Sequence, residues 1–479
     1  MLLRAVLTLS LLLTTAALPQ AALALNAAEA RHLLGRGGFS ASPAEIEALA
    51  PLSREEAVAA VLAGVRREAA TPPPAWTEDW TPPQRRGLSE AERLALRDTR
   101  RKQAKELKGW WLREMVATPA PLTEVMTLFW HNHFTSSLEK VKAPALLYRQ
   151  NLLLRRHALG NFADLLHAIA RDPAMLIYLD NARSRKEAPN ENFARELLEL
   201  FTLGEGRYRE ADLKQAARAF TGWSVDPQSG DFTFRRRWHD DGEKTILGRR
   251  GAFDGDDVIG LLLARPETAE LIVTKLWRHF ISERPDPPEV RRLAALFRGQ
   301  NYEIKPLLAA LFTSEAFWAA ENRGRLIKSP VDLVVGTVRL FGLPVREDGD
   351  LAWLTRRLGQ DLFDPPDVKG WPGGTAWITS ASLLDRQALL ARITGSEAGG
   401  SEAGGSGAGA PMMETGATPQ RRAAFFDNWL AALPARWQAA EATTLLVLAV
   451  PPVDSTVLDR QASGALLRSL LADPAYHVK

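Results

Sequence analysis

The sequence predicts a mostly α-helical protein, in which one large multi-helix domain carries a small β-ribbon insertion. Apolar residues recur at three- and four-residue spacing along most of the 479-residue chain, which is the pattern of amphipathic helices. Between residues 231 and 247 this pattern gives way to an alternation of Phe232 and Phe234 with polar residues, which is typical of a strand. At 46% hydrophobic composition, the chain can bury a large core.

Local start and stop signals support the helices. Asn190 is a good N-cap for the segment 191–203, and Gly204 follows its last turn. Ser329 and Pro330 open another helix as N-cap and first residue. The predicted helices of the main domain cover residues 54–68, 89–117, 122–133, 144–157, 162–169, 191–203, 211–220, 266–281, 289–297, 305–312, 330–341 and 380–393.

The β-ribbon is predicted from a turn dipeptide and two short runs. Asp241 and Gly242 form a pair favoured in hairpin turns. We therefore expect residues 245–247 to return as a strand beside Phe232 and Phe234.

The first 24 residues resemble a secretory signal peptide. Arg4 is followed by an uncharged, mostly apolar run over residues 5–17, and Ala22-Leu23-Ala24 is a cleavage pattern of small residues. The run is shorter than the roughly 20 residues of a transmembrane helix. We expect cleavage after Ala24, export to the periplasm or the exterior, and no integral membrane span in the mature chain.

The rest of the chain divides by composition. Residues 25–394 are expected to form the helical main domain, and residues 395–419 a linker rich in Gly, Ser and Ala. Residues 420–479 are predicted to contain helices at 421–433 and 456–471 with a strand-like run at 444–450. Because about 60 residues make only a marginal core, we expect this segment to pack on the main domain.

Composition excludes several classes of function. The chain has no Cys, so disulfide scaffolds, Cys nucleophiles and thiolate metal sites are excluded. Its 60 basic and 57 acidic residues nearly balance, and no long basic run is interleaved with aromatics, so no nucleic-acid partner is expected. The common local motifs of serine hydrolases, nucleotide-binding enzymes and zinc proteases are missing.

The helix at 191–203 admits two interpretations. Glu191, Arg195 and Glu199 follow one another at four-residue steps, as in a ladder of ion pairs on a solvated face. Alternatively this face lines a cleft, with Glu196 or Glu191 as an acid/base group or metal ligand, and with Arg195 holding a carboxylate in place.

Histidines supply the candidate metal ligands. On a continuous helix, His133 lies in the inward apolar stripe and His131 points about 200° away, so one helix cannot present both rings to one metal. The alternative is that both are structural. Asp240 follows His239 and could orient its ring, although turn chemistry also explains this segment. Lys369 lies in a turn-rich loop, 367–374, that is either functional or a rigid turn anchored by Trp371.

Several segments together resemble one bacterial family, an exported family known as domain of unknown function 1800. The resemblance spans roughly residues 30–393 and the end of the tail. It is carried by the segments 129–134 (FWHNHF), 190–201 (NENFARELLELF), 219–223 (AFTGW), 239–240 (HD), 327–330 (IKSP), 367–371 (DVKGW) and 473–476 (DPAY). The resemblance implies no assigned activity and no catalytic residues. It does imply an association with a sulfatase-like exported protein, which family members often have as a genomic neighbour.

These observations leave three functions to test. The first is an accessory or binding protein that works with the sulfatase-like partner. The second is a metal-dependent hydrolase that uses a His/Glu cluster and a divalent metal. The third is carbohydrate binding, for which the 14 Trp residues offer stacking surfaces. The candidate catalytic residues are Glu191, Arg195, Glu196 and Lys369, and the candidate metal ligands are His131, His133, His239 and Asp240.

Overall fold

The computed structural model describes residues 23–78, 87–345, 350–394, 419–459 and 462–479. It confirms the predicted fold class, because 63% of the described residues are helical and these residues include only two small antiparallel two-stranded sheets. The first helices are α1 (Ala27–Gly37), α2 (Pro43–Leu49), α3 (Arg54–Ala63), α4 (Glu90–Ala117), α5 (Pro121–His133), α6 (Leu138–Val141), α7 (Pro144–His157), α8 (Phe162–Ala170) and α9 (Pro173–Tyr178).

The middle of the chain continues the helical pattern. Its helices are α10 (Glu191–Glu196), the π-helix η3 (Leu197–Thr202), α11 (Glu210–Ala219), α12 (Gly255–Leu263), α13 (Pro266–Phe280), α14 (Pro287–Gly299), α15 (Ile304–Phe312), α16 (Glu315–Trp318), α17 (Pro330–Phe341), α18 (Asp350–Arg357) and α19 (Ser380–Thr394). Local capping fixes several starts: Ser89 caps α4 in a capping box with Glu92, and Asn190 caps α10.

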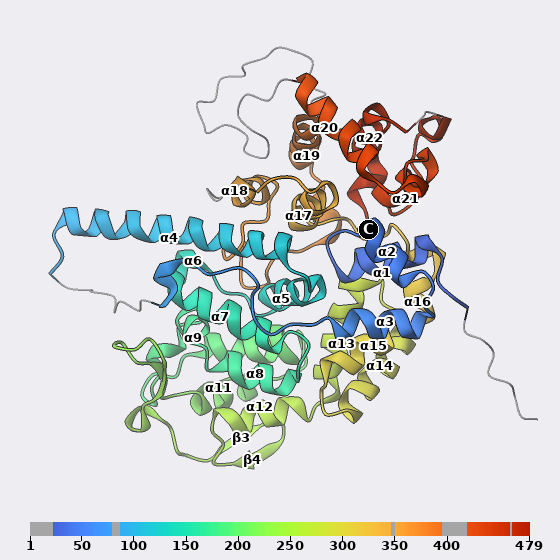
Figure 1. Cartoon of the computed structure of the whole chain (residues 1–479). Helices are drawn as coiled ribbons and strands as arrows, with labels where there is room; N and C mark the ends of the chain where they lie inside the picture. Colours follow the sequence, from blue (N-terminus) through green and yellow to red (C-terminus); the bar gives the residue numbers. More distant parts are fainter. Residues whose placement is uncertain (1–22, 79–86, 346–349, 395–418, 460–461) are drawn as a thin grey trace, which may run out of the picture.

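Helix α5 occupies the centre of the molecule. Figure 1 shows α1–α3 and α13–α16 on one side of it, α7–α12 below it, and α17–α22 above it. Nearly every side chain of α5 is buried, including both of its histidines. The N-terminal half of α4 extends away from this body (Figure 1). The end of α5 is therefore placed to contact several layers at once.

The predicted β-ribbon exists as two hairpins, and the predicted pairing is wrong. Phe232–Phe234 (β2) pairs with Trp223–Val225 (β1), whereas Lys244–Ile246 (β3) pairs with Arg249–Gly251 (β4). The second turn is at Leu247 and Gly248, which both have positive φ, as a type I′ turn requires. Asp241-Gly242 is not a hairpin turn, because β2 before it and β3 after it belong to different sheets. The Lys244 ammonium binds the backbone oxygens of Asp240 and Gly242.

The tail contains α20 (Pro419–Ala432), α21 (Ala440–Val447) and α22 (Gly464–Ala472). The prediction of a strand-like run at 444–450 is wrong, because the first half of this segment is the end of α21. The helix predicted at 456–471 is split into a short 3-10 turn, Ser455–Asp459, and α22. Contacts join the tail to the rest of the chain: Arg31 of α1 donates to Leu446 O and Val447 O, at 3.3 and 3.2 Å.

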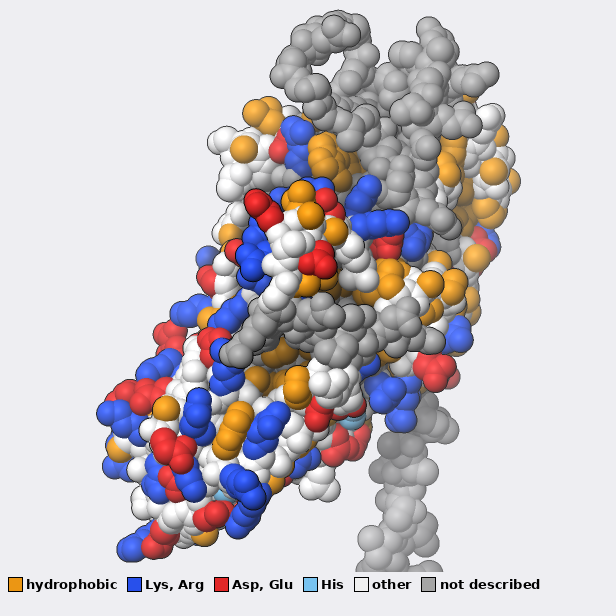
Figure 2. Space-filling model, turned by 90° about the vertical axis from the view of Figure 1, so that its left-hand side faces the viewer, with side chains coloured by type: hydrophobic (Ala, Val, Ile, Leu, Met, Phe, Trp, Pro, Cys, Tyr) orange, Lys and Arg blue, Asp and Glu red, His pale blue; other side chains and the backbone are white. Residues whose placement is uncertain are grey.

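Two sequence predictions fall on segments outside this description. The predicted signal peptide, residues 1–24, lies outside the described residues except for Leu23 and Ala24, and so does the predicted linker, residues 395–419, except for Pro419. None of the described helices combines the length and apolar character needed to cross a membrane. On the face shown in Figure 2, basic and acidic side chains are intermixed over the lower part of the molecule.

Candidate functional site

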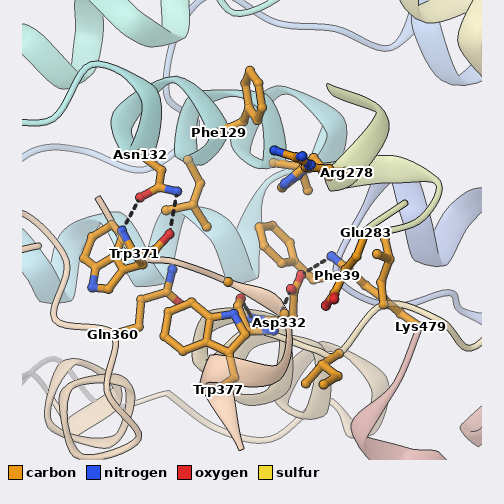
Figure 3. Close-up of a pocket in the computed structure, with 18 residues that line it drawn as sticks. Phe39, Phe129, Asn132, Arg278, Glu283, Asp332, Gln360, Trp371, Trp377 and Lys479 are labelled. Carbon is orange, nitrogen blue, oxygen red and sulfur yellow. Dashed lines mark hydrogen bonds and ion pairs between the residues drawn. The ribbon is translucent and has the colours of Figure 1, made fainter. Parts of the chain in front are cut away.

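Four segments far apart in the sequence meet around a cavity of about 140 Å³ (Figure 3). They are the end of α5, the start of α17, the loop that leads to the short turn Gly374–Trp377, and the C-terminal residues after α22. Apolar walls come from side chains such as Phe129, Trp371 and Trp377. The exposed Arg278 and Glu283 line its mouth, so the cavity is open to solvent there.

Asn132 fixes the loop that forms one wall of the cavity. Its side-chain oxygen accepts from Trp371 N at 2.7 Å, and its amide nitrogen donates to Trp371 O at 3.2 Å. Gly370 has a φ of 82°, and a Cβ there would lie 2.3 Å from Asn132 Oδ1. Only glycine allows the backbone to approach this closely, so the amide clamp explains the glycine before Trp371.

The floor of the cavity is an ion pair between the start of α17 and the last residue of the chain. Asp332 forms a capping box with Ser329, through bonds of 3.0 Å in both directions. Its other oxygen accepts from Lys479 Nζ at 2.8 Å. Despite the cost of burial, Lys479 and the backbone bond to Ser329 hold the pKa of Asp332 below its usual value. Asp332 is therefore a negatively charged carboxylate, and it lines the cavity.

His131 supports the same loop from behind. The ring contacts Trp111, Phe363 and Trp371, with centroids 5.1, 5.0 and 5.9 Å away. Its Nε2 accepts from Phe363 N at 3.3 Å. Burial lowers the pKa of His131 to about 3, so the ring is neutral. It positions the loop.

His133 supports a different segment, the π-helix η3. Lys275 Nζ donates both to His133 Nδ1, at 2.8 Å, and to Leu200 O, at 3.1 Å. Burial holds the pKa of His133 well below its usual value and lowers that of Lys275 to about 8. The two histidines thus face opposite sides of α5, as the helix geometry predicts, and His133 is buried.

The π-helix η3 changes the direction in which the acidic side chains of the segment 191–203 point. Leu203 N donates to Leu198 O at 2.8 Å, a five-residue step that sequence periodicity does not reveal. Such turns are rare and frequent at functional sites. Glu196, immediately before η3, is buried rather than solvated, and burial and the charge of Glu199 raise its pKa.

Lys369 lies near enough to Glu196 for their charges to interact, which the sequence did not predict. Its ammonium binds Glu205 Oε1 at 2.8 Å, and its charge lowers the pKa of Glu196. Lys369 and Glu205 are both largely exposed. Glu196 and Lys369 thus interact electrostatically, and neither of them lines the cavity.

Glu191 and Arg195 form the predicted surface pair. Arg195 Nη2 lies 3.4 Å from Glu191 Oε2 and 3.7 Å from Glu210 Oε1, and all three side chains are substantially exposed. The first step of the predicted ladder is therefore present as a weak, solvated pair, whereas Glu199 accepts from Tyr208 Oη at 2.6 Å. Arg195 also lowers the pKa of Glu196.

His239 and Asp240 do not line the cavity, and they make no contact with Glu196 or Lys369 in the described structure. His239 Nδ1 donates to Thr221 O at 2.8 Å, while Asp240 binds Arg218 through bonds of 2.7 and 2.9 Å. Asp240 therefore does not orient the ring of His239. Within the described part of the chain, no three His, Asp or Glu side chains are grouped to hold a metal ion. This geometry gives no support to a metal centre built from His131, His133, His239 and Asp240.

The sequence did not identify the charged residues of the cavity. Asp332 has the spacing of a capping box, which explains it without a site. Glu283 and Lys479 occur in no recognisable pattern. Other lining residues gave a signal, because they belong to segments of the family resemblance; they are Phe129, Asn132, Ile327, Ser329 and Trp371.

Comparison with known families agrees with these segments. The profile of the family described as "Protein of unknown function (DUF1800)" matches residues 32–478, and the chain belongs to this family. Searches of curated proteins and of solved structures give no significant match.

Proposed function

We propose that this member of a family of unknown function is a binding protein that holds one sugar residue in the cavity between Trp371, Trp377 and the Asp332–Lys479 pair. The observation that carries the proposal is the composition of this cavity, where two indoles meet amide, carboxylate and guanidinium groups. Aromatic rings pack against the C–H faces of a sugar, while planar polar groups bind its hydroxyls. Aromatic rings and planar polar groups both line this one cavity.

The size of the cavity supports a ligand of one ring. A cavity of about 150 Å³ in another protein accepts benzene, and this one measures about 140 Å³. Sites for larger organic ligands usually occupy roughly 300–1,000 Å³. A single residue at the end of a chain therefore fits, with the rest of the ligand outside, near Arg278 and Glu283.

We expect monosaccharides to stabilise the protein in a thermal-unfolding assay, because a ligand that binds only the folded state raises its stability by about 1.4 kcal/mol at ten times its dissociation constant. The Trp377→Leu variant should lose this effect, because it removes one indole wall. Trp353→Leu is the matched control, since Trp353 is 37% exposed and outside the cavity. Stabilisation by free amino acids in place of sugars, or an equal response from all three proteins, would overturn the assignment.

We further propose an exported, accessory role beside a sulfatase-like protein, which the family resemblance supports. A binding protein that presents a sugar residue suits such a role. The test is co-purification of the two mature proteins at micromolar concentration. Retention is expected, and free elution of each protein would contradict the pairing without affecting the sugar-binding proposal.

A further inference from the structure

A second, smaller cavity of about 30 Å³ adjoins the first. The two cavities share Phe39, Asp332 and Lys479 among their lining residues. A volume of 30 Å³ corresponds to roughly two or three water molecules, so the inner cavity has room for a small polar substituent and not for a second ring. We propose that this inner cavity binds an anionic substituent of the sugar, and this inference rests on the proposed function.

The lining of the inner cavity carries an excess of positive charge. Arg31, Lys328 and Lys479 contribute cations, and Asp332 is the one acid among its described lining residues. Asp332 is already paired with Lys479. Arg31 donates to neutral carbonyls at the end of α21. Neither Arg31 nor Lys328 forms an ion pair within the described residues, although Asp332 lies near enough to raise the pKa of Lys328. Positive charge therefore exceeds negative charge around this space, which favours an anion there.

Lys328 is the central group of this site. Its ammonium lies 4.0 Å from the centre of the Tyr476 ring, and no carboxylate forms an ion pair with it among the residues that the structure describes. Burial, followed by the charge of Arg31, lowers the pKa of Lys328 to about 7. A bound anion would stabilise the charged form and raise that pKa again.

Unpaired donors lie directly behind Lys328. Arg386 is fully buried and donates through Nη2 to Lys328 O at 2.8 Å. Within the described residues, its Nε and Nη1 have no hydrogen-bond partner. The backbone oxygen of His477 accepts from Lys328 N at 2.8 Å. Buried donors without acceptors are rare in folded proteins. Arg386 does not line the inner cavity, but its charge lies next to the backbone of Lys328 and adds to the positive potential there. Several cations around a small space is the chemistry that recognises an oxyanion.

The test compares glucose with glucuronate, glucose 6-phosphate and glucose 6-sulfate by calorimetric titration of the whole mature protein. We expect at least one charged sugar to bind about tenfold more tightly than glucose or better, because charge-assisted bonds in a desolvated site are strong. The three compounds also distinguish carboxylate, phosphate and sulfate as the preferred group. Lys328→Met should abolish the advantage at nearly constant side-chain volume, whereas the control Lys305→Met, at an exposed position on α15, should keep it.

The outcomes separate the two proposals. Equal affinity for glucose and all its charged derivatives would overturn the anion site and leave sugar binding intact. If no sugar binds, sugar binding fails, and inorganic sulfate or phosphate then tests the anion site by thermal unfolding against chloride at matched ionic strength. Stabilisation of the wild type but not of Lys328→Met would support the site, and no difference from chloride would overturn it.

Discussion

Replacing Arg155 with alanine is expected to lower the free energy of unfolding by about 3–5 kcal/mol, because it leaves a buried carboxylate without its partner. Arg155 on α7 and Glu124 on α5 are each 1% exposed. Arg155 Nε and Nη2 donate to the two oxygens of Glu124 at 2.7 and 2.9 Å. Trp111 Nε1 of α4 also donates to Glu124, at 2.8 Å. One carboxylate thus joins three helices around the centre of the fold.

Denaturant unfolding of four variants measures this effect: Arg155→Ala, Glu124→Ala, the double variant and Arg156→Ala. Arg156→Ala is the control, because Arg156 is the exposed neighbour on the same helix, and it should change stability by less than about 0.5 kcal/mol. The double variant Glu124→Ala/Arg155→Ala should cost clearly less than the sum of the two single variants, since neither charge is then left alone. A loss below about 1 kcal/mol for Arg155→Ala alone would show that the pair is not buried as described.

Acidification from neutral pH to about pH 4.5 is expected to destabilise the protein strongly, through histidines that are buried in the neutral form. The described residues hold four buried rings whose pKa is lowered mainly by burial: His32 and His131 to about 3, His477 to about 4, and His133 well below its usual value. An unfolded histidine titrates near 6.5. Between about pH 6.5 and pH 4 the unfolded state therefore binds more protons, so the free energy of unfolding falls as the pH falls.

The size of this effect follows from proton linkage. Each ring contributes at most about 1.4 kcal/mol per pH unit within its window. Asp172 acts in the opposite direction, because burial raises its pKa to about 7, so its contribution becomes more favourable as the pH falls. Burial raises the pKa of Glu196 and Asp361 as well, and it lowers the pKa of a fifth ring, that of the half-buried His279, to about 3. We expect the five imidazoles to outweigh the three carboxyl groups, so that the net change is a loss of stability.

Denaturant unfolding at several pH values tests the prediction. His131→Phe should reduce the pH dependence of the free energy of unfolding by the contribution of one imidazole. It removes one titrating group and places a phenyl ring among the aromatic side chains that surround it. His167→Gln is the control, because His167 is about one-third exposed and its replacement keeps all the buried rings in place, so most of the pH dependence should remain. A free energy of unfolding that is equal at pH 7 and at about pH 4.5 would contradict the account of buried neutral rings.

Features that depend on neighbouring residues in the chain were predictable. The starts of α4, α10 and α17 follow from Ser89, Asn190 and Ser329, because an N-cap bonds to backbone groups two or three residues ahead. The burial of His133 and the opposite direction of His131 follow from helix periodicity alone. The paired strands were mispredicted because each short strand can pair with several others, and only packing selects the partner.

By itself, the sequence determined the helical class of this protein, the starts of its major helices and the segments that distinguish its family, because each depends on periodicity or on bonds within one turn. The tertiary structure alone decided the rest. It placed Asn132 against Trp371, Asp332 against Lys479, and Glu196 beside Lys369, across as many as 239 positions of the chain. Such contacts depend on which helices pack together, and packing is a property of the assembled core that no local pattern encodes.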